Sequence, residues 1–280
     1  MTVVVVTDSA ADLPPTLARS FGIRVVPLSV TVGQRTFADG EDLTPEAFWE
    51  LVAPKDAVAT TASPPPEAFA RAYRQAAEAG AQAVVSVHLS GSLSRTLESA
   101  RTAAAGAAVP VEVVDSRAVS AGEGLVALAA ARAAADGGVL AEVAALARDA
   151  PGRLRLYAML DSVEFLRRGG RLAGAKAAAS DRLRIRPVLT LADGNAQLVA
   201  RSRTRSRGVE EVLARTAGPA EAATVIHSGA PEVDQVAARV EAACGVPPLT
   251  VLVGPAIGAH LGPRAIGVAV LAPKSAAPSQ

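Results

Sequence analysis

Four consecutive valines near the beginning of the chain constrain its fold more than any other feature. Val3–Val6 is apolar and β-branched throughout, and it ends at the polar residues Thr7-Asp8-Ser9. A strand without a polar face is covered on both sides, which is typical of parallel sheets flanked by helices. The run therefore favours an α/β fold.

Segments with strand and helix character alternate through the first half of the chain. At Thr44-Pro45-Glu46 an N-cap residue precedes a proline and an acidic residue, which predicts the start of a helix. The other predicted helices are Pro14–Phe21, Pro66–Ala79, Leu93–Ala105 and Val119–Ala135. The predicted strands are Val3–Val6, Ala83–Val87 and Val111–Val114, and Arg24–Val32 is expected to be extended chain. Because helices separate the strands, we expect a three-layer α/β domain with a parallel sheet over residues 1–150.

The second half of the chain has a different pattern. Pro187–Leu191 and Gln197–Arg201 flank Asp193-Gly194, which is typical of an antiparallel hairpin. Further strands are expected at Arg153–Met159, Ala223–His227, Leu249–Val253 and Ile266–Val270, and helices at Ser162–Arg167, Val209–Thr216 and Glu232–Ala243. We therefore predict a C-terminal α+β domain with a mixed sheet over residues 151–280.

Composition excludes several classes of protein. Half of the 280 residues are hydrophobic, which is enough for a sizeable core and excludes wholesale disorder. Aromatic residues make up 3%, too few for a surface that stacks the bases of single-stranded nucleic acid. The single cysteine, Cys244, excludes an internal disulfide and a multi-cysteine metal site. We expect no nucleic-acid partner.

The chain shows neither a secretory signal nor a membrane span. The valine run is too short for the apolar part of a signal peptide. No stretch approaches the roughly 18 apolar residues that a transmembrane helix needs. We expect a cytoplasmic protein without stable membrane insertion.

Charge is distributed unevenly along the chain. The net charge is +1, but the segment 167–207, here called the basic segment, holds eleven basic residues against two acidic ones. This imbalance favours a phosphate-bearing or acidic partner for one face of the protein. Arginines that pair with acidic neighbours in the fold would give the same pattern, so both interpretations stay open.

Polar residues follow two of the predicted strands. Thr7-Asp8-Ser9 lies at the edge where open α/β sheets bind ligands, although Asp12 or its neighbours could simply cap the helix that starts at Pro14. The segment 90–96 holds four hydroxyl groups between a strand and a helix. A helix N-terminus of this kind can bind an anion, and simple capping by one serine is the alternative.

Two further segments hold side chains that could contact a ligand. Thr60–Ser63 precedes three prolines, and its hydroxyls could cap the next helix or face a ligand carboxylate. His260 lies in what looks like a Gly/Pro-rich turn, where histidines are often functional. With three histidines and no visible His/Cys/Asp cluster, neither zinc nor another metal is expected. No dinucleotide fingerprint or Walker motif is present, so no cofactor is expected either.

A serine acyl-hydrolase is an alternative for the hydroxyl-rich segment. Gly91-Ser92-Leu93-Ser94-Arg95 lacks the second small residue of a nucleophile elbow. A triad would also need a histidine oriented by an acidic residue. The sequence holds no complete motif of this kind.

Short motifs are spread over nearly the whole chain. They are Thr7-Asp8-Ser9, Phe37-x-Asp39-Gly40, the segment around Thr61, Leu93-Ser94-x-Thr96, Asp115-Ser116, Phe165–Arg171, Arg186-Pro187-Val188-Leu189 and His260-x-Gly262-Pro263. Each is weak alone, but together and in this order they resemble the DegV family of bacterial fatty-acid-binding proteins.

The resemblance implies a two-domain protein that buries a long-chain fatty acid at the domain junction. It implies that Thr61 and Ser94 contact the carboxylate with His260 close by, and that Arg171 and Arg167 lie near the head group and a partner. Characterised members are non-enzymatic, lipid-binding subunits of bacterial fatty-acid kinase. A separate ATP-dependent kinase subunit phosphorylates the presented carboxylate, which gives an acyl phosphate for phospholipid synthesis.

The chain departs from the family pattern at a few positions. Arg95 and Arg264 stand where small residues are expected, and they could narrow the head-group opening or add charge to it. A regulatory module that binds another apolar carboxylate is therefore an alternative to the lipid carrier.

Overall fold

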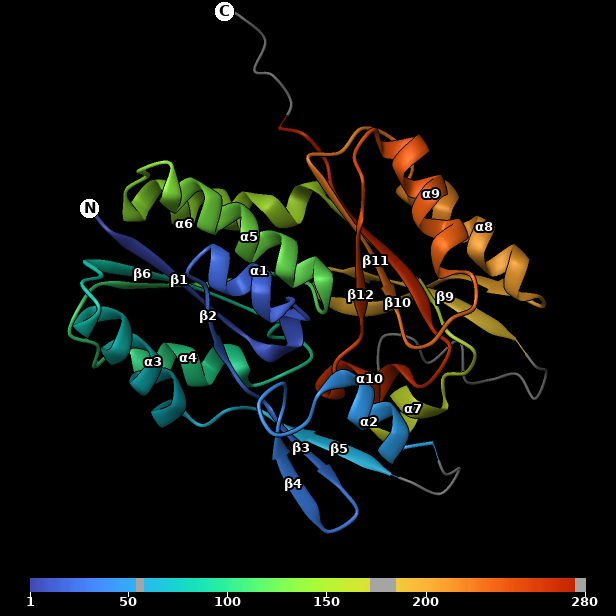
Figure 1. Ribbon diagram of the computed structural model, residues 1–280, viewed down its shortest axis with the longest axis horizontal. Helices are drawn as coiled ribbons and strands as arrows, with labels where there is room; N and C mark the ends of the chain where they lie inside the picture. The colour runs from blue at the N-terminus through green and yellow to red at the C-terminus, as the bar shows by residue number, and fades with distance from the viewer. Residues whose placement is uncertain (54–57, 172–184, 275–280) are drawn as a thin grey trace, which may run out of the picture.

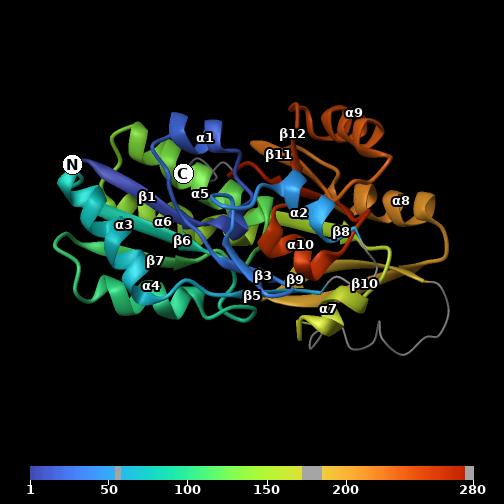
Figure 2. The same ribbon diagram turned by 60° about the horizontal axis from the view of Figure 1, so that its bottom comes forward.

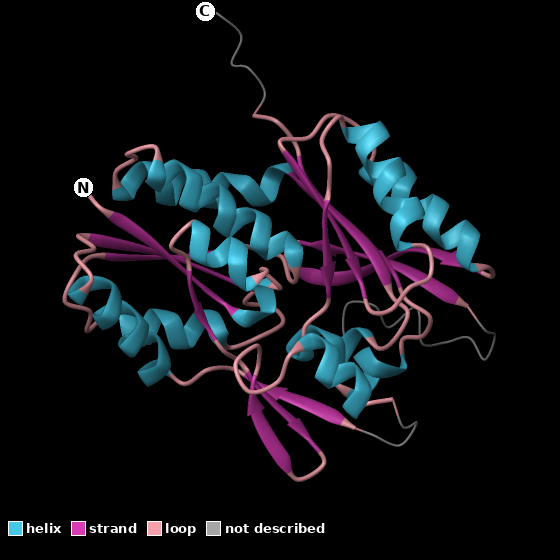
Figure 3. Cartoon of the chain, in the orientation of Figure 1, coloured by secondary structure: helices cyan, strands magenta, loops and turns pink. Residues whose placement is uncertain are grey.

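The computed structural model describes residues 1–53, 58–171 and 185–274. In these ranges the strands form two large sheets and one small one (Figures 1 and 3). The fold agrees with the predicted class, an α/β protein with a parallel N-terminal sheet and a mixed C-terminal sheet.

The N-terminal sheet has four parallel strands in the order β2-β1-β6-β7. Their bounds are β1 Val3–Asp8, β2 Arg24–Val26, β6 Ala83–His88 and β7 Val111–Asp115. Successive side chains of a strand point to opposite faces. Val3 and Val5 accordingly join one hydrophobic cluster, while Val4 and Val6 join another. This alternation explains why the valine run has no polar face.

Helices cover both faces of this sheet, which gives the three expected layers (Figure 1). One face carries α5 (Ala121–Ala135) and α6 (Leu140–Asp149), and the other carries α3 (Pro66–Glu78) and α4 (Thr96–Ala104). The short α1 (Pro15–Ser20) packs beside β2.

The C-terminal sheet has six strands in the order β10-β9-β8-β13-β11-β12, and only β11 and β12 are parallel. Their bounds are β8 Leu154–Met159, β9 Arg186–Ala192, β10 Asn195–Ser202, β11 Ala222–His227, β12 Leu249–Leu252 and β13 Ile266–Leu271. Helices α8 (Arg205–Thr216) and α9 (Val233–Cys244) cover one face. The other face meets α5, so the core of the first half continues into the second.

A small antiparallel sheet and three short helices lie where the two large sheets meet (Figure 2). Its order is β4-β3-β5, with bounds β3 Ser29–Val32, β4 Arg35–Ala38 and β5 Ala59–Ala62. The helices are α2 (Pro45–Leu51), α7 (Glu164–Arg168) and α10 (Pro255–Leu261). Two 3-10 turns, η1 (Ser9–Ala11) and η2 (Ala150–Arg153), complete the described elements.

The extended chain expected over Arg24–Val32 is found as β2 and β3, which belong to different sheets. Other local predictions were wrong. The helix expected from Leu93 begins at Thr96, because Ser90 ties the preceding turn through its carbonyl and hydroxyl groups. His260 lies on helix α10 rather than in a turn. Neither β5 nor α6 was predicted.

Across the described residues, no helix is both long and apolar enough to cross a bilayer.

Candidate functional site

An apolar cavity of about 130 Å³ lies between the C-terminal sheet, the small sheet and helix α10. The elements that line it come from both halves of the chain. Its apolar lining includes Leu28, Leu89, Leu93, Leu156, Leu160, Leu189, Leu191, Ile226 and Ile257. A concave apolar space with a few polar groups is the usual form of a small-molecule site.

Four of the five predicted site residues line this cavity. They are Thr61 on β5, Ser94 before α4, Arg171 after α7 and His260 on α10. Thr61 Oγ1 and His260 Nε2 are 2.8 Å apart. The fold therefore gathers side chains that are up to 199 positions apart in sequence.

His260 is held in its neutral form. Burial, and secondarily the positive charge of Arg171, lower the pKa of His260 to about 4. The Nδ1 atom is buried without a hydrogen-bond partner, so the ring proton belongs on Nε2. We assign this tautomer because an unpaired N–H would cost more than an unpaired lone pair. His260 then donates to Thr61, so the Thr61 hydroxyl group keeps its own proton to donate to another acceptor.

Ser94 belongs to a short chain of hydroxyl groups. Its Oγ lies 2.9 Å from Ser63 Oγ and 2.9 Å from Thr96 Oγ1, and it accepts a bond from the Thr96 N–H. Ser94 thus bonds the first residue of α4 and also lines the cavity, while the N-cap position of α4 is Arg95, without a side-chain cap bond. Anion binding by this segment stays a prediction.

The two predicted arginines differ in position. Arg171 donates to the carbonyl oxygens of Leu93 (3.3 Å) and Gly169 (2.6 Å), which fixes its guanidinium beside the cavity. Arg167 is exposed and pairs with Glu164 at 2.7 Å, away from the cavity lining. The bonds from Arg167, and then Arg168, lower the pKa of Glu164 to about 2.

The effect of Arg95 and Arg264 on the head-group opening or its charge stays a prediction, and each of them pairs with an acidic residue. Arg95 pairs with Glu98 at 3.1 Å, and Arg264 pairs with Asp161 at 3.3 Å. Neither belongs to the described lining. Asp161 also accepts from Arg205 at 2.6 Å.

The basic segment is therefore partly neutralised within the fold. Arg186 pairs with Asp161, and Arg205 pairs with both Asp161 and Glu232. Lys176, Arg182 and Arg184 lie outside the described residues. The explanation by acidic neighbours holds for the paired arginines, while Arg171 faces the cavity.

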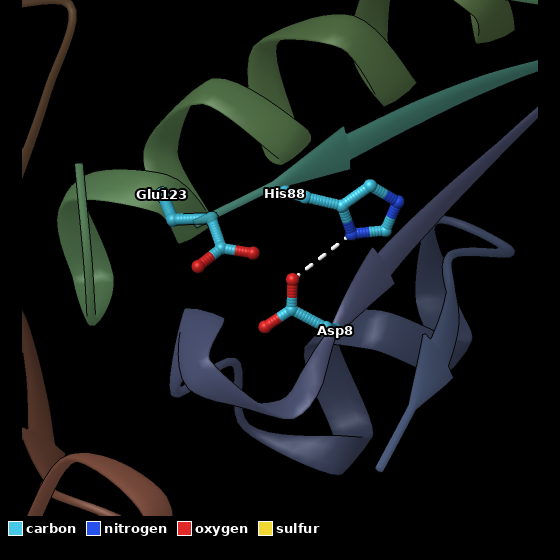
Figure 4. A group of neighbouring side chains, drawn as sticks. All are labelled: Asp8, His88 and Glu123. Atoms are coloured by element: carbon cyan, nitrogen blue, oxygen red, sulfur yellow. Dashed lines mark hydrogen bonds and ion pairs between the residues drawn. The ribbon is translucent and has the colours of Figure 1, made fainter. Parts of the chain in front are cut away.

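A buried polar cluster of Asp8, His88 and Glu123 was not predicted from the sequence (Figure 4). Their ligating atoms lie within 4.8 Å of one another, so the expectation of no acid and histidine cluster was wrong. Asp8 accepts from His88 Nδ1 at 2.9 Å, and Thr7 donates to Glu123 at 3.0 Å. Burial, followed by the charge of Asp8, raises the pKa of Glu123 well above its usual value. A protonated Glu123 can donate to Asp8.

This cluster has the hydrogen-bond order of a hydrolase triad but not its access. His88 Nε2 lies 2.7 Å from Ser86 Oγ, and Asp8 orients the other ring nitrogen. Ser86, His88 and Asp8 are fully buried, Ser86 also bonds the Tyr73 hydroxyl, and none belongs to the described cavity lining. A nucleophilic serine needs an exposed hydroxyl beside its substrate, so this arrangement is structural.

Comparison with known proteins places the chain in a family. The model of the DegV family, whose description is "uncharacterised protein, DegV family", matches residues 2–273. A DegV domain-containing protein of Streptomyces coelicolor is 37% identical over 96% of this chain and 98% of its own length.

Two solved structures are also similar. A DegV family protein from Thermus thermophilus, described for its fatty acid binding, has a TM-score of 0.90 and 35% identity, and covers 98% of this chain and 100% of its own. DegV from Bacillus subtilis, described as a fatty acid binding protein, has a TM-score of 0.87 and 27% identity with the same coverage. The chain belongs to the DegV family.

Proposed function

We propose that this protein binds one long-chain fatty acid, with its acyl chain in the apolar cavity and its carboxylate held by Thr61, Ser94 and Arg171, with His260 close by. The observation that carries the proposal is the cavity itself, whose lining is aliphatic except for this polar group, Ser120 and Thr190. The fatty acid binding described for the proteins from Thermus thermophilus and Bacillus subtilis supports it.

The energetics of such a ligand match this lining. Each buried CH₂ group contributes about 0.8 kcal/mol, so an acyl chain favours an aliphatic cavity. A desolvated carboxylate must be hydrogen-bonded, since an unpaired buried charge is strongly disfavoured. The hydroxyls of Thr61 and Ser94 are neutral donors, and Arg171 brings a positive charge to the same cavity.

The protein acts as a carrier rather than as an enzyme. The bound carboxylate is presented at the junction of residues 1–150 and 151–280 to a separate ATP-dependent kinase subunit, which forms the acyl phosphate used in phospholipid synthesis. Arg167 is 61% exposed and belongs to the motif that ends at Arg171, so it is suited to contact that subunit. The resemblance to lipid-binding subunits of fatty-acid kinase supports this role.

The head-group assignment is tested by titration with cis-parinaric acid, a fluorescent 18-carbon fatty acid. Ser94→Ala removes a hydroxyl from the cavity lining, and Ser92→Ala removes one from an exposed position in the same segment. We expect Ser94→Ala to weaken binding by about tenfold, because it removes a hydrogen bond to a charged group. Ser92→Ala should leave the affinity unchanged. Equal affinities of the two variants would overturn the assignment.

A further inference from the structure

Helix α10, which carries His260, begins at a residue without a side chain. Gly254 is its N-cap, so the helix cannot cap its own first turn through a side chain. Two aspartates from elsewhere in the chain supply the missing acceptors. Asp12 Oδ1 accepts from the Gly254 N–H at 2.9 Å, and Asp39 accepts from the Ala256 N–H. Carboxylates are favourable at this end of a helix because they satisfy its unpaired N–H groups.

Both aspartates are held in place by hydroxyl groups. Ser120 donates to Asp12 Oδ2 at 2.5 Å, and Ser9 donates to Asp39 Oδ2 at 2.7 Å. Ser9 Oγ in turn accepts from the Leu28 N–H at 2.9 Å. These bonds connect η1, the start of α5 and the turn before β3 to the first turn of α10.

The backbone around Asp12 is shaped for this contact. Asp12 has φ +49°, and Ser120 has φ +54° with ψ −146°. Non-glycine residues in such conformations are strained and persist where their surroundings fix them. A Cβ on Gly254 would lie 2.8 Å from Asp12 Oδ1, so the close approach requires glycine.

The other end of α10 forms part of the cavity. The helix has seven residues, and helix geometry fixes the rise and the rotation from its first turn to its last. It packs against α7, β5 and α2 (Figures 1 and 2), and His260 reaches Thr61 of β5 from its last turn. The position of the first turn therefore sets the position of His260.

We propose that Asp12 and Asp39 are positioning residues for the head-group site, because they hold the first turn of α10 and thereby place His260 against Thr61. The inference rests on the proposed function for its effect on lipid affinity, but the placement of His260 is independent of any ligand. Neither aspartate belongs to the described cavity lining.

The electrostatic surroundings agree with this role. Asp12 and Asp39 face each other, Asp8 at the end of β1, and Glu123 on α5, while His260 is the titratable group of α10 itself. Burial raises the pKa of Asp12 and of Asp39 to about 7, although the hydrogen bonds that they accept lower it. Asp39 is buried and Asp12 is partly buried, so both are retained at an energetic cost, which a specific contact such as the cap of α10 offsets.

The placement is tested by an NMR titration of the His260 imidazole in ligand-free protein, with His227 as the internal reference. In the wild type we expect His260 to titrate at about 4. In Asp12→Ala and Asp39→Ala, the released helix exposes the ring, so its pKa should rise toward the ordinary 6.5. Asp12→Asn and Asp39→Asn keep a carbonyl acceptor and should retain the wild-type value.

Affinity for cis-parinaric acid provides the second measurement. We expect a loss of at least tenfold in the alanine variants, less than threefold in the asparagine variants, and none in Asp136→Ala, whose aspartate is exposed at the end of α5. If the alanine variants do not fold, Gly254→Ala displaces the same contact without removing a charge, and it should raise the His260 pKa as well.

Unchanged His260 titration in Asp12→Ala, Asp39→Ala and Gly254→Ala would overturn the proposal. So would loss of binding that is equal in the alanine and asparagine variants. A wild-type protein that binds no fatty acid but shows the expected His260 shifts would contradict the proposed function alone.

Discussion

The neutral side chain of His260 determines how the proposed head-group site can bind a carboxylate. The pKa of His260 lies at about 4 because the ring is buried and faces Arg171. Near neutral pH the imidazole therefore acts as a hydrogen-bond donor to Thr61 and not as a counter-ion. Recognition of the carboxylate then falls to hydroxyl groups and to one arginine, which avoids a buried salt bridge with histidine.

Burial lowers the pKa of His260 but raises the pKa of Glu123. Its pKa is raised, so the carboxyl group of the native state keeps a proton that the unfolded state loses above about pH 4.5. Stability from this group is present at low pH and is lost as pH rises through the native pKa. Glutamine has the shape of a protonated glutamate and does not titrate.

Glu123→Gln should therefore gain stability over the wild type as pH rises. Chemical denaturation at pH 5 and pH 8 measures this, with Glu98→Gln, exposed on α4, as the control. A Glu123→Gln variant that is destabilised more at pH 8 than at pH 5 would show that the native carboxyl is ionised or binds a cation there.

Site residues that lie far apart in the sequence could be predicted only in part. Thr61, Ser94, Arg171 and His260 were identified through a resemblance, and the fold brings them to one cavity. Asp12 was expected at most to cap the helix that starts near Pro14. It contacts residues 108 and 242 positions away, and no local pattern encodes such a contact.

Elements were predicted best where burial imposes a regular pattern. The valine run and the hairpin around Asp193-Gly194 appear as β1 and as β9 and β10. Helix α10 was mistaken for a turn because Pro255, Gly258 and Gly262 interrupt its pattern. Proline is tolerated at the first helical position, and Gly258 lets the helix approach Trp49. Tertiary packing therefore stabilises a helix that local propensity disfavours.

The contact between α7 and α10 gives a prediction at the scale of elements. A Cβ on Gly169 would lie 2.0 Å from His260 Nδ1. Gly169→Ala should displace the ring, cost about 1–3 kcal/mol of stability by overpacking, and weaken fatty acid binding by at least tenfold. Thermal denaturation and lipid titration measure the two effects.

Gly106→Ala is the matched control, because a Cβ there meets nothing within 4 Å. It should change stability by less than about 0.5 kcal/mol, as exposed substitutions do. Wild-type lipid affinity in Gly169→Ala would contradict the tight placement of His260.

At the scale of the molecule, the two halves share both a core and a cavity. Helix α5 packs on the N-terminal sheet and on one face of the C-terminal sheet, so one hydrophobic cluster runs through both halves. The sequence predicted both sheets, but it could not predict that a third sheet and α10 fill their junction. Their packing depends on contacts between distant segments.

The proposed kinase contact is a prediction at this scale. Arg167→Glu should reduce acyl phosphate formation by at least tenfold when ATP, a fatty acid and the kinase subunit are supplied. Lipid affinity should change less than twofold, because Arg167 is exposed and outside the cavity lining.

Arg74→Glu, a comparably exposed arginine on α3, is its control and should preserve activity. Loss of lipid binding in parallel with activity, or full activity in Arg167→Glu, would remove this residue from the partner surface.

Native mass spectrometry of the freshly purified protein, with extraction and identification of any bound molecule, tests the central claim most directly. We predict one long-chain fatty acid per chain, with reduced occupancy in Ser94→Ala. A protein that is purified empty and takes up no added fatty acid would contradict the assignment of the cavity as a lipid site.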